Sequence, residues 1–261
     1  MTPTVELLLF VLIAVLLLAL AEAGFRIGMR LHRTIGVAEA RARQFATVQE
    51  AVLILVSLML GFTFAMALER YNTRRELVIK EANAIGTTFL RASMLPEPHT
   101  AAVRDALRRY VDLKLRGERM YGGDTDAIAT GSPAIFQLQA ELWRHATESA
   151  KIQQNAITQT FIETVNAVID VDEERLEEGR VNVPAAVWVM LVVVAAFACM
   201  VTGFRAGAEG VRTALANVLV PALITIVIVI ILDVAHPLHG TISISQQPLR
   251  DVQSFMASWK D

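Results

Sequence analysis

Apolar residues gather in four long runs along this chain, and polar stretches separate the runs. The runs cover residues 5–24, 48–68, 184–204 and 214–232. A helix of about 20 mostly apolar residues can cross the roughly 30 Å hydrocarbon layer of a bilayer, and its own hydrogen bonds satisfy its backbone there. The pattern therefore predicts an all-α integral membrane protein with four transmembrane helices.

The four runs fall into two pairs, because a polar segment at 69–182 lies between the second run and the third. The start of that segment continues the second run without a proline, which predicts one helical rod over 46–95. A second helix, capped by Thr100, would bury the stripe of Val103, Leu107, Tyr110 and Val111. After a loop at 121–133, a long helix would run to about residue 178, with a bend or exposed turn at 151–154. We expect a central extramembrane helical bundle.

These elements divide the chain into four expected parts: a first transmembrane pair at 1–68, the helical domain at 69–182, a second pair at 183–232 and a C-terminal part at 233–261. Within the C-terminal part, residues 241–245 alternate apolar and polar side chains, which predicts a short strand. Pro248 suits the first turn of a closing amphipathic helix. We expect this helix to pack on the central helices, because it has few basic residues for a lipid surface.

Composition and charge narrow the class of protein. Hydrophobic residues make up 54% of the chain and charged residues 19%, as in a protein that is partly embedded in lipid. The net charge of −2 offers no basic domain for nucleic acid. The single cysteine, Cys199, excludes an intrachain disulfide.

Arginines favour one orientation in the membrane. The links at 25–45 and 205–212 carry seven of them: Arg26, Arg30, Arg33, Arg41, Arg43, Arg205 and Arg212. The positive-inside rule then predicts cytoplasmic links and a central domain on the outer side. Arg70, Arg74 and Arg75, just after the second run, reduce this bias.

No motif of an enzyme is present, since the sequence has no phosphate-binding glycine loop, nucleophile elbow or His-Glu-x-x-His. We therefore expect no catalytic residue and no cofactor. His236 and His239 lie near Asp233, but Pro237 between them interrupts the helical spacing that a metal site would use. The interpretation is a tight turn, with no metal ligand in it.

The second run carries the most informative face. Ser57, Gly61, Phe64 and Leu68 recur at steps of three and four residues, so they share one side of a helix. Small residues at this spacing allow close packing against another helix of the bundle. Alternatively the face lines a pore within a ring of subunits, with Phe64 and Leu68 as an apolar constriction. Both interpretations stay open.

A family resemblance is carried by the segment that follows. Its quoted residues are Arg70, Tyr71, Arg74, Arg75, Glu81, Asn83, Gly86, Thr87, Leu90 and Arg91, with Asp233, Pro237, Gly240, Ile242, Ser245, Pro248 and Leu249 in the tail. Over nearly the whole chain, this pattern resembles a bacterial membrane family called bestrophin-like. Glu81, Asn83, Gly86 and Thr87 would either pack closely on a neighbouring helix or line a polar conduit.

The resemblance implies a multi-pass protein of the bacterial inner membrane. Bestrophins themselves are pentameric anion or cation channels, so it also implies a homo-oligomer in a lipid bilayer and inorganic ions as partners. Two departures stand against full equivalence: the arginines favour the opposite orientation, and 234–261 has no acidic calcium clasp.

Two functions of different classes follow. The first is an oligomeric ion channel with the second transmembrane helix lining the pore. The second is a membrane-anchored sensor or interaction protein with an extracytoplasmic helical bundle, although the sequence shows no output domain for it.

Overall fold

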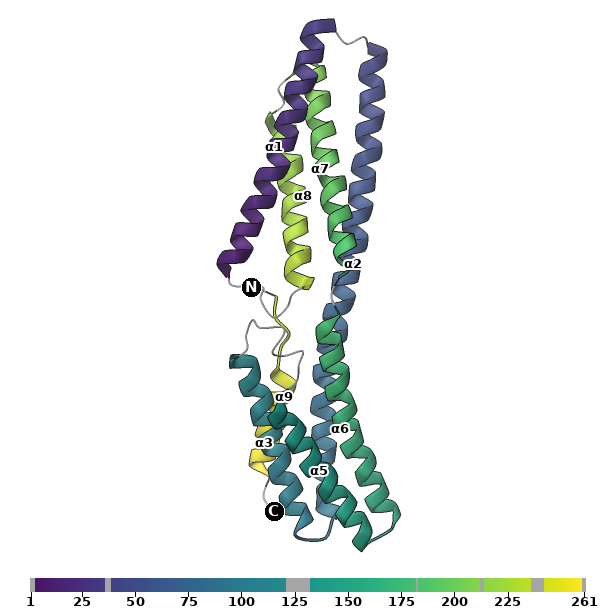
Figure 1. The fold of residues 1–261 in the computed structure, drawn as a ribbon, viewed down its shortest axis with the longest axis vertical. Helices are drawn as coiled ribbons and strands as arrows, with labels where there is room; N and C mark the ends of the chain where they lie inside the picture. Colours follow the sequence, from purple (N-terminus) through teal and green to yellow (C-terminus); the bar gives the residue numbers. More distant parts are fainter. Residues whose placement is uncertain are drawn as a thin grey trace. The chain divides into compact units, whose positions relative to one another are not determined.

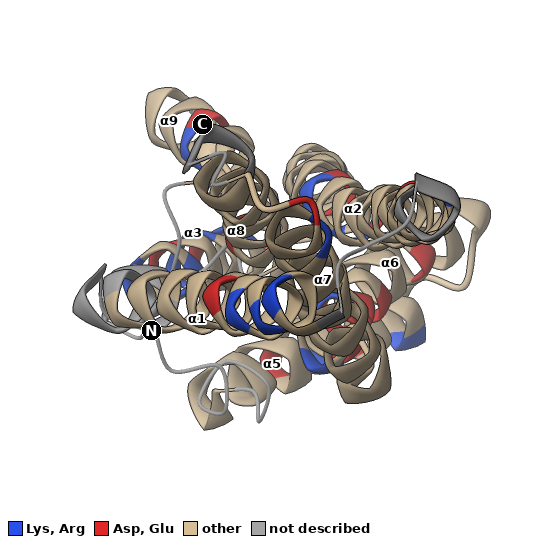
Figure 2. Cartoon of the chain, turned by 90° about the horizontal axis from the view of Figure 1, so that it is seen from above, with Lys and Arg blue, Asp and Glu red and all other residues tan. Residues whose placement is uncertain are grey.

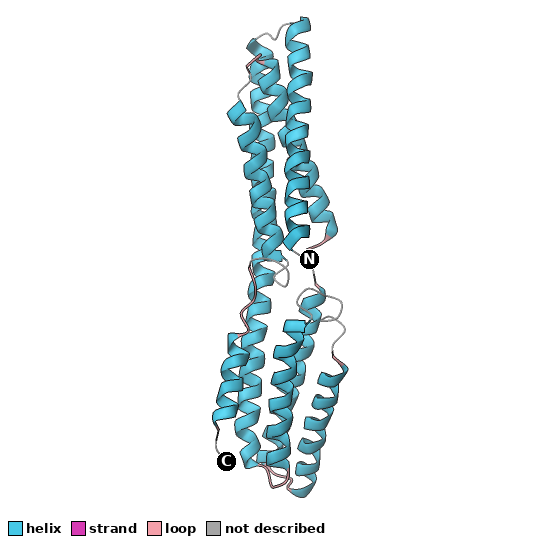
Figure 3. Cartoon of the chain, turned by 90° about the vertical axis from the view of Figure 1, so that its left-hand side faces the viewer, coloured by secondary structure: helices cyan, strands magenta, loops and turns pink. Residues whose placement is uncertain are grey.

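The computed structural model describes residues 3–35, 39–120, 132–181, 183–211, 214–235 and 242–259. Over these ranges the chain forms helices and no strand (Figure 3). It divides into two compact units. The first unit holds Met1–Glu69 with Val183–Ile242, and the second unit holds Arg70–Asn182 with Ser243–Asp261. Residues 121–131 of the loop predicted at 121–133 lie outside the described residues, as do His236 and His239.

The first unit contains the apolar helices (Figure 1). They are α1 (Pro3–Ile35), the first part of α2 (Glu39–Arg91), α7 (Ala185–Ala208) and α8 (Ala214–Ala235). Among the described residues, four helices are long and apolar enough to cross a membrane. The prediction of an all-helical chain with four such helices is therefore confirmed.

Helical structure extends further than the apolar runs. The predicted link at 25–45 is mostly helix, because α1 continues to Ile35 and α2 begins at Glu39. Arginine is a good helix former, and Arg26 pairs with Glu22 one turn earlier at 2.9 Å. The predicted rod over 46–95 is confirmed as one helix, and it ends at Arg91 before a short 3₁₀ turn, η1 (Ala92–Met94).

Glycines let α1 and α7 approach closely. Gly24 and Gly28 on α1 face α7, while Gly203 and Gly207 on α7 face α1. A Cβ atom at Gly203 would lie 1.9 Å from the Ala21 carbonyl oxygen, so no larger residue fits there. Each helix therefore carries a Gly-x-x-x-Gly pair, the spacing that brings membrane helices into backbone contact. α8 packs against both helices.

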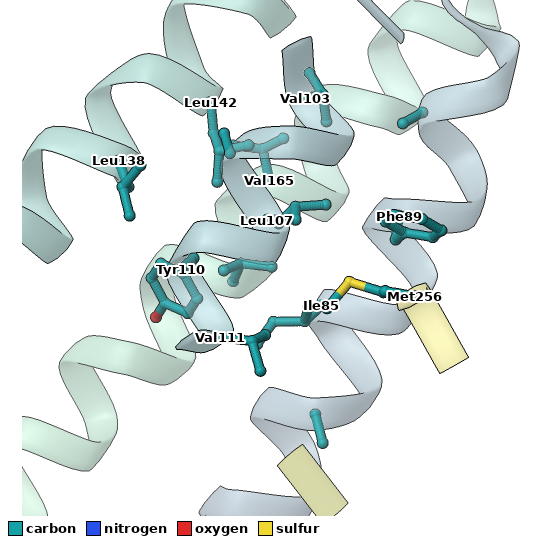
Figure 4. Packing of buried hydrophobic residues seen from close by; sticks show 14 of the residues in the cluster. Ile85, Phe89, Val103, Leu107, Tyr110, Val111, Leu138, Leu142, Val165 and Met256 are labelled. Carbon is teal, nitrogen blue, oxygen red and sulfur yellow. The ribbon is translucent and has the colours of Figure 1, made fainter. Parts of the chain in front are cut away.

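The second unit is a bundle of helices around its own apolar core. Over its described residues it contains the rest of α2 together with α3 (His99–Met120), α5 (Pro133–Ile152), α6 (Ala156–Arg180) and α9 (Gln247–Ser258). The predicted stripe of Val103, Leu107, Tyr110 and Val111 is fully buried there, which confirms it (Figure 4). Thr100 is not the cap, since α3 starts at His99.

The long helix expected from residue 133 is interrupted. α5 ends at Ile152 and α6 begins at Ala156. Between them Asn155 caps α6, because its side chain accepts hydrogen bonds from the backbone N–H groups of Ile157 and Thr158, each at 3.0 Å. At the polar residues 151–154, where we expected a bend or an exposed turn, the helix therefore ends. A capping box then fixes the start of α6.

The C-terminal segment closes the second unit. Residues 242–246 are not a strand, and the described chain has no other strand with which they could pair. α9 then starts with Pro248 in its first turn, as predicted. Leu249 and Met256 of α9 are buried in the core, and Arg108 of α3 donates to the Met256 carbonyl at 3.1 Å. The predicted packing of this helix on the central helices is confirmed.

Candidate functional site

The four candidate pore residues of α2 are exposed in the first unit. Ser57 and Gly61 face away from its core, Phe64 is 38% exposed and Leu68 is 40% exposed. A Cβ atom at Gly61 would meet nothing within 4 Å apart from its own helix. We call Ser57, Gly61, Phe64 and Leu68 the α2 stripe.

The same helix packs on its own unit with a different side. Val56, Thr63 and Ala67 are buried, and Val56 joins the apolar core that also holds Leu17 and Leu191. Helix packing within the chain, one of the two interpretations of the stripe, is therefore not what the described residues show. The stripe is open to lipid, to an aqueous path or to another copy of the chain.

Family-motif residues of α2 serve different purposes in the second unit. Arg70 pairs with Glu178 of α6 at 3.3 Å, and Arg74 donates to the Val181 carbonyl at 2.9 Å. Arg75, Asn83 and Thr87 are exposed. A Cβ atom at Gly86 would lie 3.9 Å from Val252, an ordinary contact distance. Close packing within the chain therefore does not explain this glycine.

Glu81 is the motif residue with the most elaborate surroundings. Figure 2 marks the charged residues on the helices in blue and red. Within the second unit, two carboxylates and two cations form a set of ion pairs. Glu81 is 0% exposed; Arg175 pairs with one of its carboxylate oxygens and Lys114 with the other at 3.1 Å. Tyr110 donates a hydrogen bond to it at 3.0 Å.

Asp172 completes this group. It is 2% exposed, pairs with Lys114 and accepts a hydrogen bond from Gln139 at 2.6 Å. Two carboxylates and two cations therefore balance, and every one of α2, α3, α5 and α6 contributes a member. We call the six residues the charge network: Glu81, Tyr110, Lys114, Gln139, Asp172 and Arg175.

The network keeps its carboxylate ionised. Burial alone would raise the pKa of Glu81, but Arg175 and Lys114 outweigh that effect and lower it to about 2. Burial, followed by the charges of Glu81 and Asp172, raises the pKa of Tyr110, so the phenol stays protonated and can donate. A balanced, fully bonded set of this kind holds helices in one register, and it offers no open position for a substrate.

The sequence contains a signal for this network, in the form of charged residues on the apolar faces of helices. Lys114 lies three residues after Val111 and seven after Leu107, on the apolar stripe of α3. Asp172 and Arg175 continue the stripe of Phe161, Val165 and Val168 on α6. Opposite charges at core-facing positions of separate helices predict buried pairing, although spacing alone does not say which helices meet.

Fold and composition together define an all-helical membrane protein. A family model called Bestrophin-like domain matches residues 8–249, and the chain belongs to this bestrophin-like family. No protein among the curated ones matches the chain in sequence.

Solved structures show the same fold. A point-mutated form of a bacterial bestrophin homologue from Klebsiella pneumoniae is similar over 95% of this chain and 97% of its own, with 13% identity and a TM-score of 0.70. Another structure of that homologue covers 94% and 96%, with 12% identity and a TM-score of 0.69. A further crystallised membrane protein covers 96% and 99%, with 12% identity and a TM-score of 0.70.

Proposed function

We propose that this protein is an oligomeric ion channel of the bacterial inner membrane, in which α2 helices from several copies surround the ion path. The observation that carries the proposal is the exposed α2 stripe in a chain of bestrophin-like fold. On this proposal the four apolar helices cross the bilayer in two pairs, and the bundle of the second unit lies outside it.

The stripe has the chemistry of a narrow path with a gate. The Ser57 hydroxyl donates to the Leu53 carbonyl at 2.9 Å, which leaves its oxygen lone pairs able to face water or a cation. At Gly61 the backbone is bare, so the path is widest there. Phe64 and Leu68 follow at one-turn spacing, and a ring of such side chains closes a pore by excluding water.

The charge network suits the same proposal as a rigid support. A pore helix that continues beyond the bilayer transmits any tilt along its whole length, so its outer half needs a fixed partner. Glu81 attaches α2 to α3 and α6 through ion pairs inside the second unit. The network thus stabilises the extension of the helix that carries the stripe.

The test compares ion flux in liposomes that contain equal amounts of inserted protein. Phe64→Ala should raise basal flux several-fold because it removes the widest apolar side chain of the stripe. Gly61→Leu should abolish flux, because several leucines would fill the path. Phe62→Ala is the matched control: Phe62 is also an exposed phenylalanine of α2, at 58%, but lies outside the stripe, and its replacement should leave flux unchanged.

Subunit number in detergent, measured by light scattering, separates a blocked pore from failed assembly. A parent protein that passes no ion under any gradient and runs as a monomer would contradict the channel. The sensor or interaction protein with an outer helical bundle would then take its place.

A further inference from the structure

Two histidines and a glutamate meet in the second unit, and none of them belongs to the α2 stripe or to the charge network. His99 is the first residue of α3, whereas His145 and Glu148 lie one turn apart on α5. The two Nδ1 atoms are 3.1 Å apart, and one ligand-type atom from each of the three residues lies within 4.8 Å of the others. His99 is only 6% exposed, and the other two are half-buried.

The spacing fits a tetrahedral metal ion. Zn²⁺ binds imidazole nitrogens at about 2.0–2.1 Å, and two such ligands at a tetrahedral angle lie about 3.3 Å from each other. The His99 and His145 nitrogens are already close to that separation. A carboxylate one turn along α5 supplies a third ligand of the type that zinc accepts beside histidines, and water can fill the fourth position.

We propose that His99, His145 and Glu148 form a binding site for a divalent transition-metal ion, with Zn²⁺ as the ion that the donor set suits best. The site joins the start of α3 to the C-terminal half of α5. It goes beyond the channel proposal and does not depend on it, since it can be occupied whether or not the protein conducts ions.

The contact between the two rings leaves room for a metal ion. Their Nδ1 atoms lie 3.1 Å apart, and a metal binds such a nitrogen only in its deprotonated form. Without a metal, one histidine donates an N–H to the Nδ1 of the other. When a metal binds both Nδ1 atoms, that proton moves to the Nε2 atom of its own ring, and both Nδ1 atoms become ligands.

Arg144 competes with the metal. Its guanidinium lies 3.2 Å from His145 Nε2 and 3.5 Å from a Glu148 carboxylate oxygen. Binding through His145 Nδ1 moves the imidazole proton to Nε2, where Arg144 can no longer donate. The Arg144 side chain is 56% exposed, so it can turn toward solvent, and its removal should make the site stronger.

The experiment uses the full-length protein in detergent, purified without a polyhistidine tag and freed of metal. Zn²⁺ binding is measured by competition with a chromophoric chelator, and the thermal midpoint is recorded with and without the ion. The parent should bind about one Zn²⁺ per chain and melt at a higher temperature when it does. His145→Gln and Glu148→Gln should each weaken binding at least about tenfold, and Arg144→Gln should tighten it.

Two controls make the result specific. The chain has five histidines, and a double variant, His236→Gln with His239→Gln, removes the two that lie three residues apart in the sequence and should bind like the parent. Metal-free thermal midpoints show that each variant is folded. No Zn²⁺ bound by the parent, equal binding by His145→Gln, or loss of binding in the His236/His239 variant would overturn the site. An Arg144→Gln variant that binds as weakly as the ligand variants would overturn it too.

Discussion

Glu81 shows how a single buried charge can matter without taking part in chemistry. Taking ions out of water costs several kcal/mol each, and mutual attraction offsets this cost only where every partner is present. All partners are present here, because Glu81 meets Arg175, Lys114 and Tyr110 together. An apolar core of the same volume could be as stable, so the network contributes mainly a fixed register of α2, α3 and α6.

Replacing Glu81 should therefore be costly even when its shape is kept. In Glu81→Gln the amide can still accept from Tyr110, but two cations then face the single charge of Asp172. We expect the loss of about 3–5 kcal/mol that follows when one partner of a buried ion pair is removed. Glu76→Gln, an exposed site on the same helix, should change stability by less than about 0.5 kcal/mol. Denaturant unfolding of both variants in the same detergent measures the difference, and equal values would contradict the network's role.

The same carboxylate makes stability depend on pH in a stated direction. Its pKa is lowered from 4.5 in the unfolded chain to about 2 in the fold, so the folded state binds this proton less readily. The stabilisation is complete above about pH 5 and is lost as pH falls toward 2, with a total of about 3 kcal/mol. Unfolding free energies across this range should fall more steeply for the parent than for Glu81→Gln. Parallel curves would show that Glu81 does not carry the effect.

At the scale of the helix, small residues identify close packing only when the facing helix is known. Ser57, Gly61 and Ala65 have the same spacing as Gly24 with Gly28 and Gly203 with Gly207. The first row is exposed, whereas the two glycine pairs bring α1 and α7 into backbone contact. Small residues at this spacing thus accompany backbone contact on α1 and α7 but an exposed face on α2, since spacing along one helix carries no information about its neighbour.

The close contact between α1 and α7 can be tested by replacing a glycine with alanine, which adds a single methyl group. Gly203→Ala would place a Cβ atom 1.9 Å from the Ala21 carbonyl oxygen, so α1 and α7 must separate. We expect a loss of about 1–3 kcal/mol or more from overpacking. Gly61→Ala, with open space around it, should be neutral or slightly stabilising because alanine favours helix. Thermal midpoints in one detergent compare the pair, and a tolerated Gly203→Ala would argue against the close contact.

Elements with a strong local signal could be predicted from the sequence, whereas contacts between residues far apart in the chain could not. The apolar runs, the α3 stripe and Pro248 at the start of α9 all follow from residues within one helix. The break before α6 depends on the cap at Asn155, whose effect competes with an otherwise helical pattern. His99 and His145 are 46 residues apart, and only the packing of α3 with α5 brings their rings together.

For the whole molecule, the exposed apolar surface of the first unit sets the main constraint. Large side chains such as Leu8, Ile54 and Val189 are more than 60% exposed, which water does not favour but lipid or further copies of the chain would cover. Membership of the bestrophin-like family is consistent with that. On our proposal the second unit lies outside the bilayer, and the arginines of the chain predict on which side.

Arginines at the ends of the apolar helices predict the orientation of the chain in the membrane. Arg30 and Arg33 near the end of α1, with Arg43 near the start of α2 and Arg205 on α7, belong to the same end of the predicted pairs. The positive-inside rule predicts that this end is cytoplasmic, so the second unit would face the periplasm. Alkaline phosphatase, which is active only outside the cytoplasm, should then be active when fused after Arg119 and inactive when fused between Ile35 and Glu39. Fusions to a cytoplasmic reporter at the same two points should give the opposite result. Activity at the α1–α2 junction with none after Arg119 would reverse the orientation, place the second unit in the cytoplasm and show that Arg70, Arg74 and Arg75 outweigh the other end.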